Sequence, residues 1–150
     1  MELTNFKDAI TFAIRKEAEA YNLYTTYGQL VKTPGLKIMF QELAQQEKLH
    51  REILENVDKK DVSAYVLKAT PDLKIGDFVK EEEFSPDMDY ASALRLAIKR
   101  EESALRLYQH LTGGTGDPEL IKLFSSLAQE EAKHKLRLET EYDESVLKWA

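Results

Sequence analysis

Two Glu-x-x-His motifs occur in this chain, and both residue types in the motif bind metal ions. The motifs are Glu47-Lys-Leu-His50 and Glu131-Ala-Lys-His134. On a helix, residues three positions apart lie on one face, about 4.5 Å apart along the axis. A carboxylate and an imidazole at this spacing can therefore reach the same ion. The chain contains no cysteine, so the available ligands are oxygen and nitrogen donors, which suit iron or manganese.

The two motifs belong to an internal repeat with an offset of 84 residues. Residues 9–55 align with residues 93–139 without a gap, with 17 identities in 47 positions. The same offset pairs Glu17 with Glu101. A repeat that keeps four acids and two imidazoles, in addition to apolar residues, favours a metal site. We therefore predict six metal ligands: Glu17, Glu47, His50, Glu101, Glu131 and His134.

Charge balance explains why these carboxylates would share a site with metal. Four ionised carboxylates in a helical core would repel one another and lose their hydration. Two divalent cations would balance their charge and leave both histidines as neutral ligands. The alternative is a duplicated hairpin whose acids form ion pairs on the surface. The positions favour burial, because Glu47 and His50 neighbour Leu43 and Leu54 on the helix.

Tyr24 and Tyr108 are candidate catalytic residues. Each follows an expected ligand, Glu17 or Glu101, by seven residues, or about two helical turns. Their hydroxyls could donate a hydrogen bond to a ligand carboxylate or pass electrons. A role as ordinary core tyrosines is equally open from the sequence.

Four long helices are expected to position these residues, because apolar residues recur at spacings of three and four. We predict helices at about residues 5–31, 36–57, 89–111 and 118–142. Thr4 or Asn5 is the expected N-cap of the first helix, and residues 33–35 and 113–118 are expected to form short turns. The predicted fold is all-α, an antiparallel four-helix bundle of two similar hairpins joined by a crossover at about 58–87.

The helix predicted at residues 36–57 carries the first Glu-x-x-His motif and should bury the side that bears it. Its apolar residues are the candidates for packing on that side. They are Ile38, Met39, Phe40, Leu43, Leu49, Ile53 and Leu54.

Length and composition limit the remaining possibilities. A chain of 150 residues is most economically one domain, residues 1–150. A net charge of -6, without a cluster of Lys and Arg, argues against a nucleic-acid partner. Nothing approaches the run of about 18 apolar residues that would predict a membrane span. The first residues lack the features of a signal peptide, so a cytoplasmic protein is expected.

The segments around the predicted ligands resemble the rubrerythrin (erythrin-type) di-iron carboxylate proteins of the ferritin-like superfamily. The resemblance covers nearly the whole chain apart from the crossover and the tail, and rests on residues 13–24, 43–50, 97–101 and 127–134. It implies a cofactor of two iron ions, with manganese as an alternative, bridged by oxide or hydroxide when oxidised. It implies these ligand roles: Glu17 and Glu101 as terminal carboxylates, Glu47 and Glu131 as bridges, and His50 and His134 as one imidazole for each iron.

Two departures from the rubrerythrin pattern bear on function. Rubrerythrins reduce hydrogen peroxide at the di-iron centre with electrons from a rubredoxin-type iron. This chain has no cysteine and therefore no fused rubredoxin domain, so an external donor such as a rubredoxin-type protein is expected. Rubrerythrins also carry a further Glu three residues after the third-helix ligand, where this chain has Ala104. The six-ligand set is thus closer to the generic ferritin-like centre.

The resemblance implies a non-haem di-iron oxidoreductase that reduces hydrogen peroxide or dioxygen and acts in oxidative stress. Two other functions remain open. One is a ferroxidase or iron-handling protein, and the other is a non-catalytic, metal-stabilised helical bundle that serves as an interaction module. The expected assembly is a homodimer, from the resemblance and from the general frequency of two-fold oligomers.

Overall fold

A computed structural model describes residues 6–59 and 84–147, and the long elements within these ranges are α-helices. They are α1 (Phe6–Leu30), α2 (Pro34–Lys59), α4 (Tyr90–Gly113) and α5 (Pro118–Ser145). Each predicted helix is present, with ends shifted by at most three residues. The N-cap predicted at Thr4 or Asn5 and most of the predicted crossover lie outside the described residues. No helix within the described ranges is long and apolar enough to cross a membrane.

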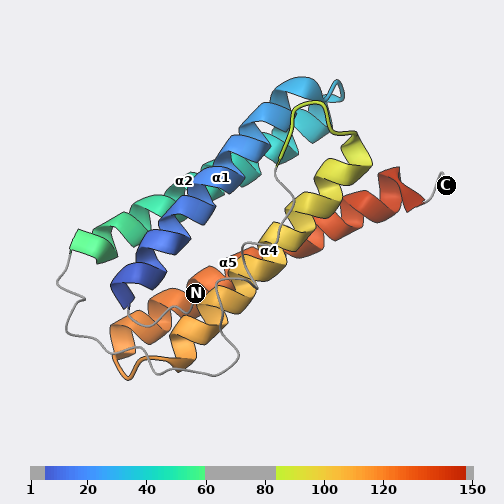
Figure 1. Ribbon diagram of the computed structural model, residues 1–150. Coiled ribbons are helices and arrows are strands. Elements are labelled where there is room, and N and C mark those ends of the chain that lie inside the picture. Colours follow the sequence, from blue (N-terminus) through green and yellow to red (C-terminus); the bar gives the residue numbers. More distant parts are fainter. Residues whose placement is uncertain (1–5, 60–83, 148–150) are drawn as a thin grey trace. The chain divides into compact units, whose positions relative to one another are not determined.

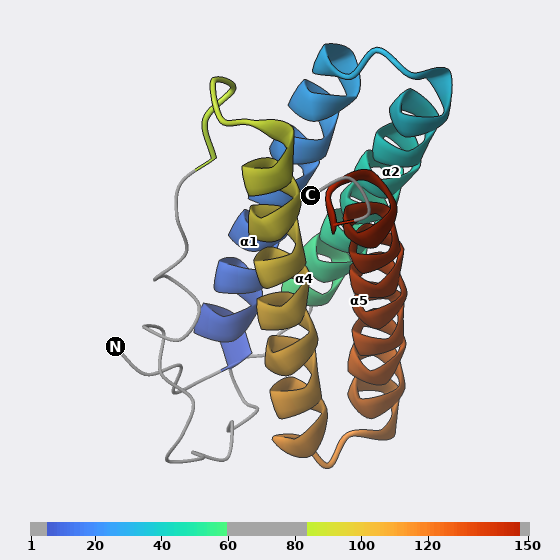
Figure 2. The same cartoon turned by 90° about the vertical axis from the view of Figure 1, so that its right-hand side faces the viewer.

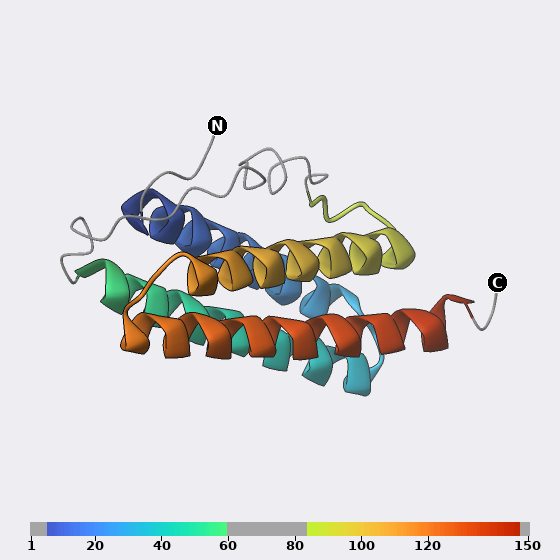
Figure 3. The ribbon, with the colours of Figure 1, turned by 90° about the horizontal axis from the view of Figure 1, so that it is seen from below.

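The four helices form two hairpins, each of which is a compact unit. Helix α1 packs along α2 (Figure 1), and α4 packs along α5. The short turn between α4 and α5 makes these two helices antiparallel, as Figures 2 and 3 show from two directions. The predicted hairpins are therefore confirmed. That the whole chain is a single domain stays a prediction.

Helix α2 begins at Pro34, two residues before the predicted start. The Lys37 backbone N–H donates to the Thr33 carbonyl at 3.0 Å, so helical bonding already begins at Thr33. Proline suits the first turn of a helix, because the N–H that it lacks would have no acceptor within the helix there. Pro118 begins α5 in the same way. Pro118 was predicted as a helix start, whereas Pro34 was expected within a turn and is the first residue of α2.

Aspartate side chains cap the two helices of the second hairpin. Asp89 accepts a hydrogen bond from the Ser92 N–H at 2.7 Å, and this bond lowers the pKa of the Asp89 carboxyl. Asp117 accepts from the Glu119 and Leu120 N–H groups at 2.8 and 3.1 Å. The first N–H groups of a helix have no acceptor within the helix, so these contacts stabilise both helix starts.

Each hairpin buries one apolar face, and the two faces use matched residues of the repeat. Eight of these side chains are at most 3% exposed: Leu23 and Leu107, Phe40 and Phe124, Leu43 and Leu127, and Leu54 and Leu138. Gly28 allows a close approach of α1 and α2, because a Cβ at this position would lie 3.3 Å from the Phe40 Cβ. The matched position on α4 is Thr112, whose hydroxyl donates to the Tyr108 carbonyl at 2.8 Å.

Three of the predicted packing residues of α2 are exposed, so the prediction is wrong for them. Ile38, Leu49 and Ile53 are 53%, 41% and 38% exposed, whereas Leu43 and Leu54 are buried as predicted. At 100° per residue, the three exposed side chains lie within about 60° of one another, on a side of α2 outside the buried stripe. Apolar character alone therefore did not identify the buried face.

Helix α5 ends at Ser145, three residues past its predicted end, and polar contacts join its last turns to the start of α4. The Tyr90 hydroxyl donates to the Glu141 carboxylate at 2.9 Å, and burial together with this carboxylate raises the pKa of Tyr90. The Arg95 guanidinium donates to the Tyr142 hydroxyl at 3.0 Å. These side chains pair across more than 40 residues, so local sequence could not reveal the contacts.

We expect the Asp117→Ala variant to lose the N-cap of α5 and about 0.5–2 kcal/mol of unfolding free energy. Urea unfolding followed by circular dichroism measures this change. Asp117→Asn should lose much less, because an asparagine side chain also accepts hydrogen bonds from the first turn. Equal stability of the alanine variant and the parent protein would show that the cap has no role.

Candidate metal centre

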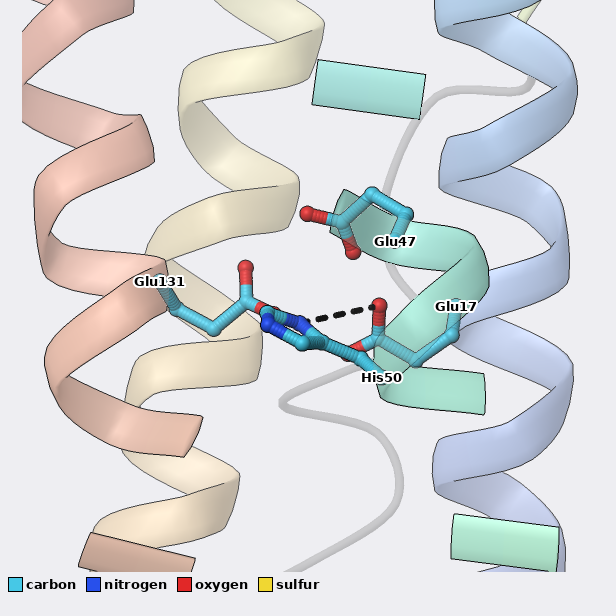
Figure 4. Close-up of side chains that lie close together, drawn as sticks. All are labelled: Glu17, Glu47, His50 and Glu131. Carbon is cyan, nitrogen blue, oxygen red and sulfur yellow. Dashed lines mark ion pairs between the residues drawn. The ribbon is translucent and has the colours of Figure 1, made fainter. Parts of the chain in front are cut away.

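The first hairpin brings Glu17, Glu47 and His50 together. Glu17 comes from α1, and Glu47 and His50 come from α2 (Figure 4). One potential ligand atom from each side chain lies within 4.8 Å of those of the other two. The His50 Nδ1 is 3.7 Å from a Glu17 carboxylate oxygen. All three residues are at most 3% exposed, so they form a buried three-donor cluster.

The second hairpin repeats this arrangement with Glu101, Glu131 and His134. Glu101 comes from α4, and α5 supplies Glu131 and His134. One potential ligand atom from each again lies within 4.8 Å of the others. The His134 Nδ1 is 3.6 Å from an oxygen of Glu101 and 3.6 Å from an oxygen of Glu131. These residues are at most 5% exposed.

Helix geometry explains how two elements make each cluster. The Glu and His of one motif are three residues apart, so both leave α2 or α5 from the same face. The antiparallel neighbour, α1 or α4, supplies the third side chain from across the hairpin. Leu43 and Leu54 flank the first motif, and Leu127 and Leu138 flank the second; all four are buried. The donors therefore lie within the apolar stripe.

The donor set fits a metal ion. Imidazole nitrogen and carboxylate oxygen are donors that iron and manganese accept. Each nitrogen–oxygen separation of 3.6–3.7 Å is longer than a hydrogen bond. Donors that each lie about 2.1 Å from one ion are about 3 Å or more apart, so these separations leave room for an ion between them. Each cluster has the composition and spacing of a metal-binding site.

The charge of the cluster side chains also favours a bound cation. Each cluster contains two carboxylates and one imidazole, and burial of ionised carboxylates is costly unless a cation balances them. One divalent ion for each hairpin would supply that balance. The alternative of surface ion pairs is wrong, because all six side chains are buried. Among residues 6–59 and 84–147, the clusters contain no residue beyond the six predicted ligands.

Tyr24 and Tyr108 are both buried, each on the helix that carries the single Glu of its hairpin. The Tyr24 ring packs near the Phe40 ring, with centroids 6.1 Å apart. This contact belongs to the α1–α2 core. The role of the two hydroxyls in catalysis stays a prediction.

Ala104 lies one helical turn after Glu101 on α4 and is half-buried. The matched residue on α1 is Ala20, which is buried. A methyl side chain has no donor atom. At this position neither hairpin can add a further carboxylate to its cluster.

Comparison with solved structures identifies the class of fold. A protein from Thermotoga maritima, described as a ferritin-like diiron-carboxylate protein, matches with a TM-score of 0.78 and 24% identity. The match covers 97% of this chain and 98% of that one. A hypothetical protein from Pyrococcus furiosus matches with a TM-score of 0.76 and 26% identity, over 95% of this chain and 90% of that one. The predicted ferritin-like fold of two helix hairpins is therefore confirmed.

A sequence comparison identifies the family, which is more specific than the class of fold. The family model described as Rubrerythrin matches residues 8–142, which include both clusters. The chain belongs to the rubrerythrin family. The comparison with curated proteins gave no match.

The cost of burying these carboxylates can be measured by removing their charge. We expect Glu47→Gln and Glu131→Gln each to raise the unfolding free energy of metal-free protein by about 1 kcal/mol or more, because glutamine keeps the shape without the buried charge. Urea unfolding in the presence of a chelator tests this. Added Mn²⁺ should stabilise the parent protein and have a smaller effect on the variants.

The matched control is the other Glu pair that the repeat keeps on α2 and α5. Glu55 and Glu139 lie outside both clusters, so Glu55→Gln and Glu139→Gln should change the stability of metal-free protein little. Lower stability of the Glu47 and Glu131 variants in chelator would contradict the charge argument.

Proposed function

We propose that this protein is a non-haem di-iron oxidoreductase that reduces hydrogen peroxide, or dioxygen, with electrons from an external donor. The observation that carries the proposal is the pair of buried clusters, each with two carboxylates and one imidazole within 4.8 Å. Membership of the rubrerythrin family supports iron as the metal, with manganese as the alternative. A role in oxidative stress and a location in the cytoplasm belong to the same proposal.

The six cluster residues would hold the two ions. Glu17 and His50 would bind one ion and Glu101 and His134 the other. Glu47 and Glu131 would be shared, as the family resemblance implies. Two ferrous ions bound there would supply the two electrons that, with two protons, convert one hydrogen peroxide into two water molecules.

The chain itself contributes position, charge and exclusion of water. The carboxylates balance the charge of the ions, and the buried leucines beside each motif keep bulk water from the donors. Tyr24 and Tyr108 are proposed to orient ligand carboxylates or to carry electrons. The chain has no cysteine with which to bind a rubredoxin-type iron, so re-reduction would require a separate donor protein.

Metal content tests the site directly. Protein purified after growth with iron should contain about two metal ions per chain, and Glu47→Ala combined with Glu131→Ala should abolish this. Elemental analysis measures the ratio of metal to protein. The matched control, Glu55→Ala combined with Glu139→Ala, should keep the full content. Unchanged metal in the Glu47 and Glu131 double variant would show that the ligand assignment is wrong.

Reaction with peroxide tests the activity. Anaerobic diferrous protein should oxidise in one fast phase, with one hydrogen peroxide consumed for every two irons, and should return to the ferrous state with a chemical reductant. Stopped-flow absorbance and peroxide titration measure the rate and the stoichiometry. Bound iron that reacts with neither peroxide nor dioxygen would exclude the oxidoreductase and leave a metal-stabilised bundle.

A ferroxidase is the second candidate, and Ala104 is the observation that favours it. Without the further Glu of rubrerythrins, the two clusters supply six donors in all, the number in the generic ferritin-like centre. The same preparation separates the two functions. A ferroxidase would turn over added ferrous iron and retain many ions per chain, whereas a peroxide reductase would stop at its two bound ions and turn over peroxide when reductant is supplied.

A further inference from the structure

The internal repeat keeps a basic residue directly after each cluster histidine. Arg51 follows His50 on α2, and Lys135 follows His134 on α5. Both basic side chains are 30% exposed. Each lies four residues after the Glu of its motif, so it leaves the helix from the side that carries that Glu. The two cations therefore lie beside the clusters, although neither is among the six cluster residues.

In the first hairpin, Arg51 contacts an aromatic ring on the other helix. Its guanidinium carbon lies 5.8 Å from the centre of the Tyr21 ring of α1. A cation within about 6 Å of a ring centre is attracted by the negative face of the ring. Because Tyr21 is four residues after Glu17, this contact joins α1 and α2 about one turn from the donor that α1 supplies. The Arg51 Nε also lies 3.6 Å from an oxygen of Glu55, but that carboxylate belongs to the same helix.

In the second hairpin, Lys135 makes an ion pair instead. Its Nζ lies 2.8 Å from a carboxylate oxygen of Glu102 on α4. Glu102 is the next residue after the donor that α4 supplies, so this contact also joins two helices beside their cluster. The residue matched with Glu102 is Ala18, and the residue matched with Tyr21 is Leu105. The two hairpins thus keep a cation at the same position but give it a chemically different partner.

The grooves beside the two contacts agree with this exchange of partners. Between α4 and α5, Leu105 and Ala128 line a groove of about 310 Å³. The matched groove between α1 and α2 is about 230 Å³ and is lined by Tyr21 and Ala44. Leu105 offers no ring face to a cation. A basic residue at this level of the second hairpin therefore needs a carboxylate as its partner.

We propose that Arg51 and Lys135 are positioning residues for the two metal clusters, Arg51 through the Tyr21 ring and Lys135 through the Glu102 carboxylate. The proposal rests on the metal centre of the proposed function. Each contact holds its two helices at the spacing that brings donors from both within 4.8 Å of one another. Both residues are cations, so they act on the donors through the helices and not as ligands.

The two contacts differ in their response to salt. Dissolved ions screen an exposed pair of opposite charges, such as Lys135 and Glu102. The contact between Arg51 and the neutral Tyr21 ring has no second charge to screen. The metal affinity of the second cluster should therefore fall more steeply with salt than that of the first.

Binding of Co²⁺ to one cluster at a time tests this proposal. His50→Ala leaves the donors of the second cluster complete, and His134→Ala leaves those of the first complete. Titration of the full chain, followed by visible absorbance, gives the affinity of the complete cluster at low and at high salt. The absorption bands of bound Co²⁺ also report the geometry of its ligands.

In the His50→Ala protein, Lys135→Gln combined with Glu102→Gln removes the ion pair without changing the net charge. This pair variant should bind Co²⁺ about two- to fivefold more weakly at low salt and lose the additional salt dependence. Lys135→Glu combined with Glu102→Lys should restore both, because the exchanged charges can pair again.

In the His134→Ala protein, Tyr21→Leu gives α1 the residue that α4 carries at the matched position. It should weaken Co²⁺ binding by about two- to fivefold at low and at high salt. Tyr21→Phe should keep the affinity, because the ring remains. The matched control, Glu55→Gln, removes the partner of Arg51 on its own helix and should also keep the affinity.

Unchanged Co²⁺ affinity in both Tyr21→Leu and the Lys135 and Glu102 pair variant would overturn the proposal, as would equal salt dependence of the two clusters. Co²⁺ still binds in these outcomes, so the metal centre and the proposed function would stand. A parent chain that binds no Co²⁺ would overturn the metal centre and this proposal together.

Discussion

The burial of charged carboxylates is the constraint on which this structure depends. Each hairpin places two glutamates and a histidine in an apolar stripe, where ionised side chains are stable only beside a cation. The same helices must therefore serve two purposes: leucines pack the stripe, and residues three positions apart interrupt it with donors. A bound metal ion would reconcile the two, because it would turn the most costly part of the core into a set of bonds that stabilise the folded chain.

The internal repeat shows which residues the two metal clusters share and which residues can differ between the two hairpins. Glu, His and Leu are kept on the inner faces of α2 and α5, while the outer faces differ at most positions, as Ile38 and Lys122 illustrate. The contact between paired helices also differs: Gly28 allows close approach in the first hairpin, and its counterpart Thr112 bonds to its own helix. The chemistry of the clusters thus restricts only one side of each helix.

Most of the fold and all six cluster residues could be predicted from the sequence, because a helical period and a repeated Glu-x-x-His motif are local signals. The rest depends on contacts between distant segments and on which side of a helix is covered. Tyr90 bonds to Glu141 from another helix, and local sequence does not contain that contact. Leu49 was expected inside because it is apolar, although it lies about 120° around α2 from the buried Leu43 and is exposed. The spacing of the Glu and His residues identified the clusters, whereas apolar residue type alone did not identify the buried side of α2.

The position after Glu101 bears on how the centre would respond to oxidation. Loss of electrons from two bound ions would add positive charge to a buried site, and that charge needs a compensating anion. Ala104 and its counterpart Ala20 carry no donor, and the six cluster residues already contribute their carboxylates. Additional negative charge would therefore have to come from solvent or substrate rather than from this position of the chain. The two proposed functions, peroxide reduction and oxidation of ferrous iron, would both work within this limit, and the supply of electrons and of iron would then decide between them.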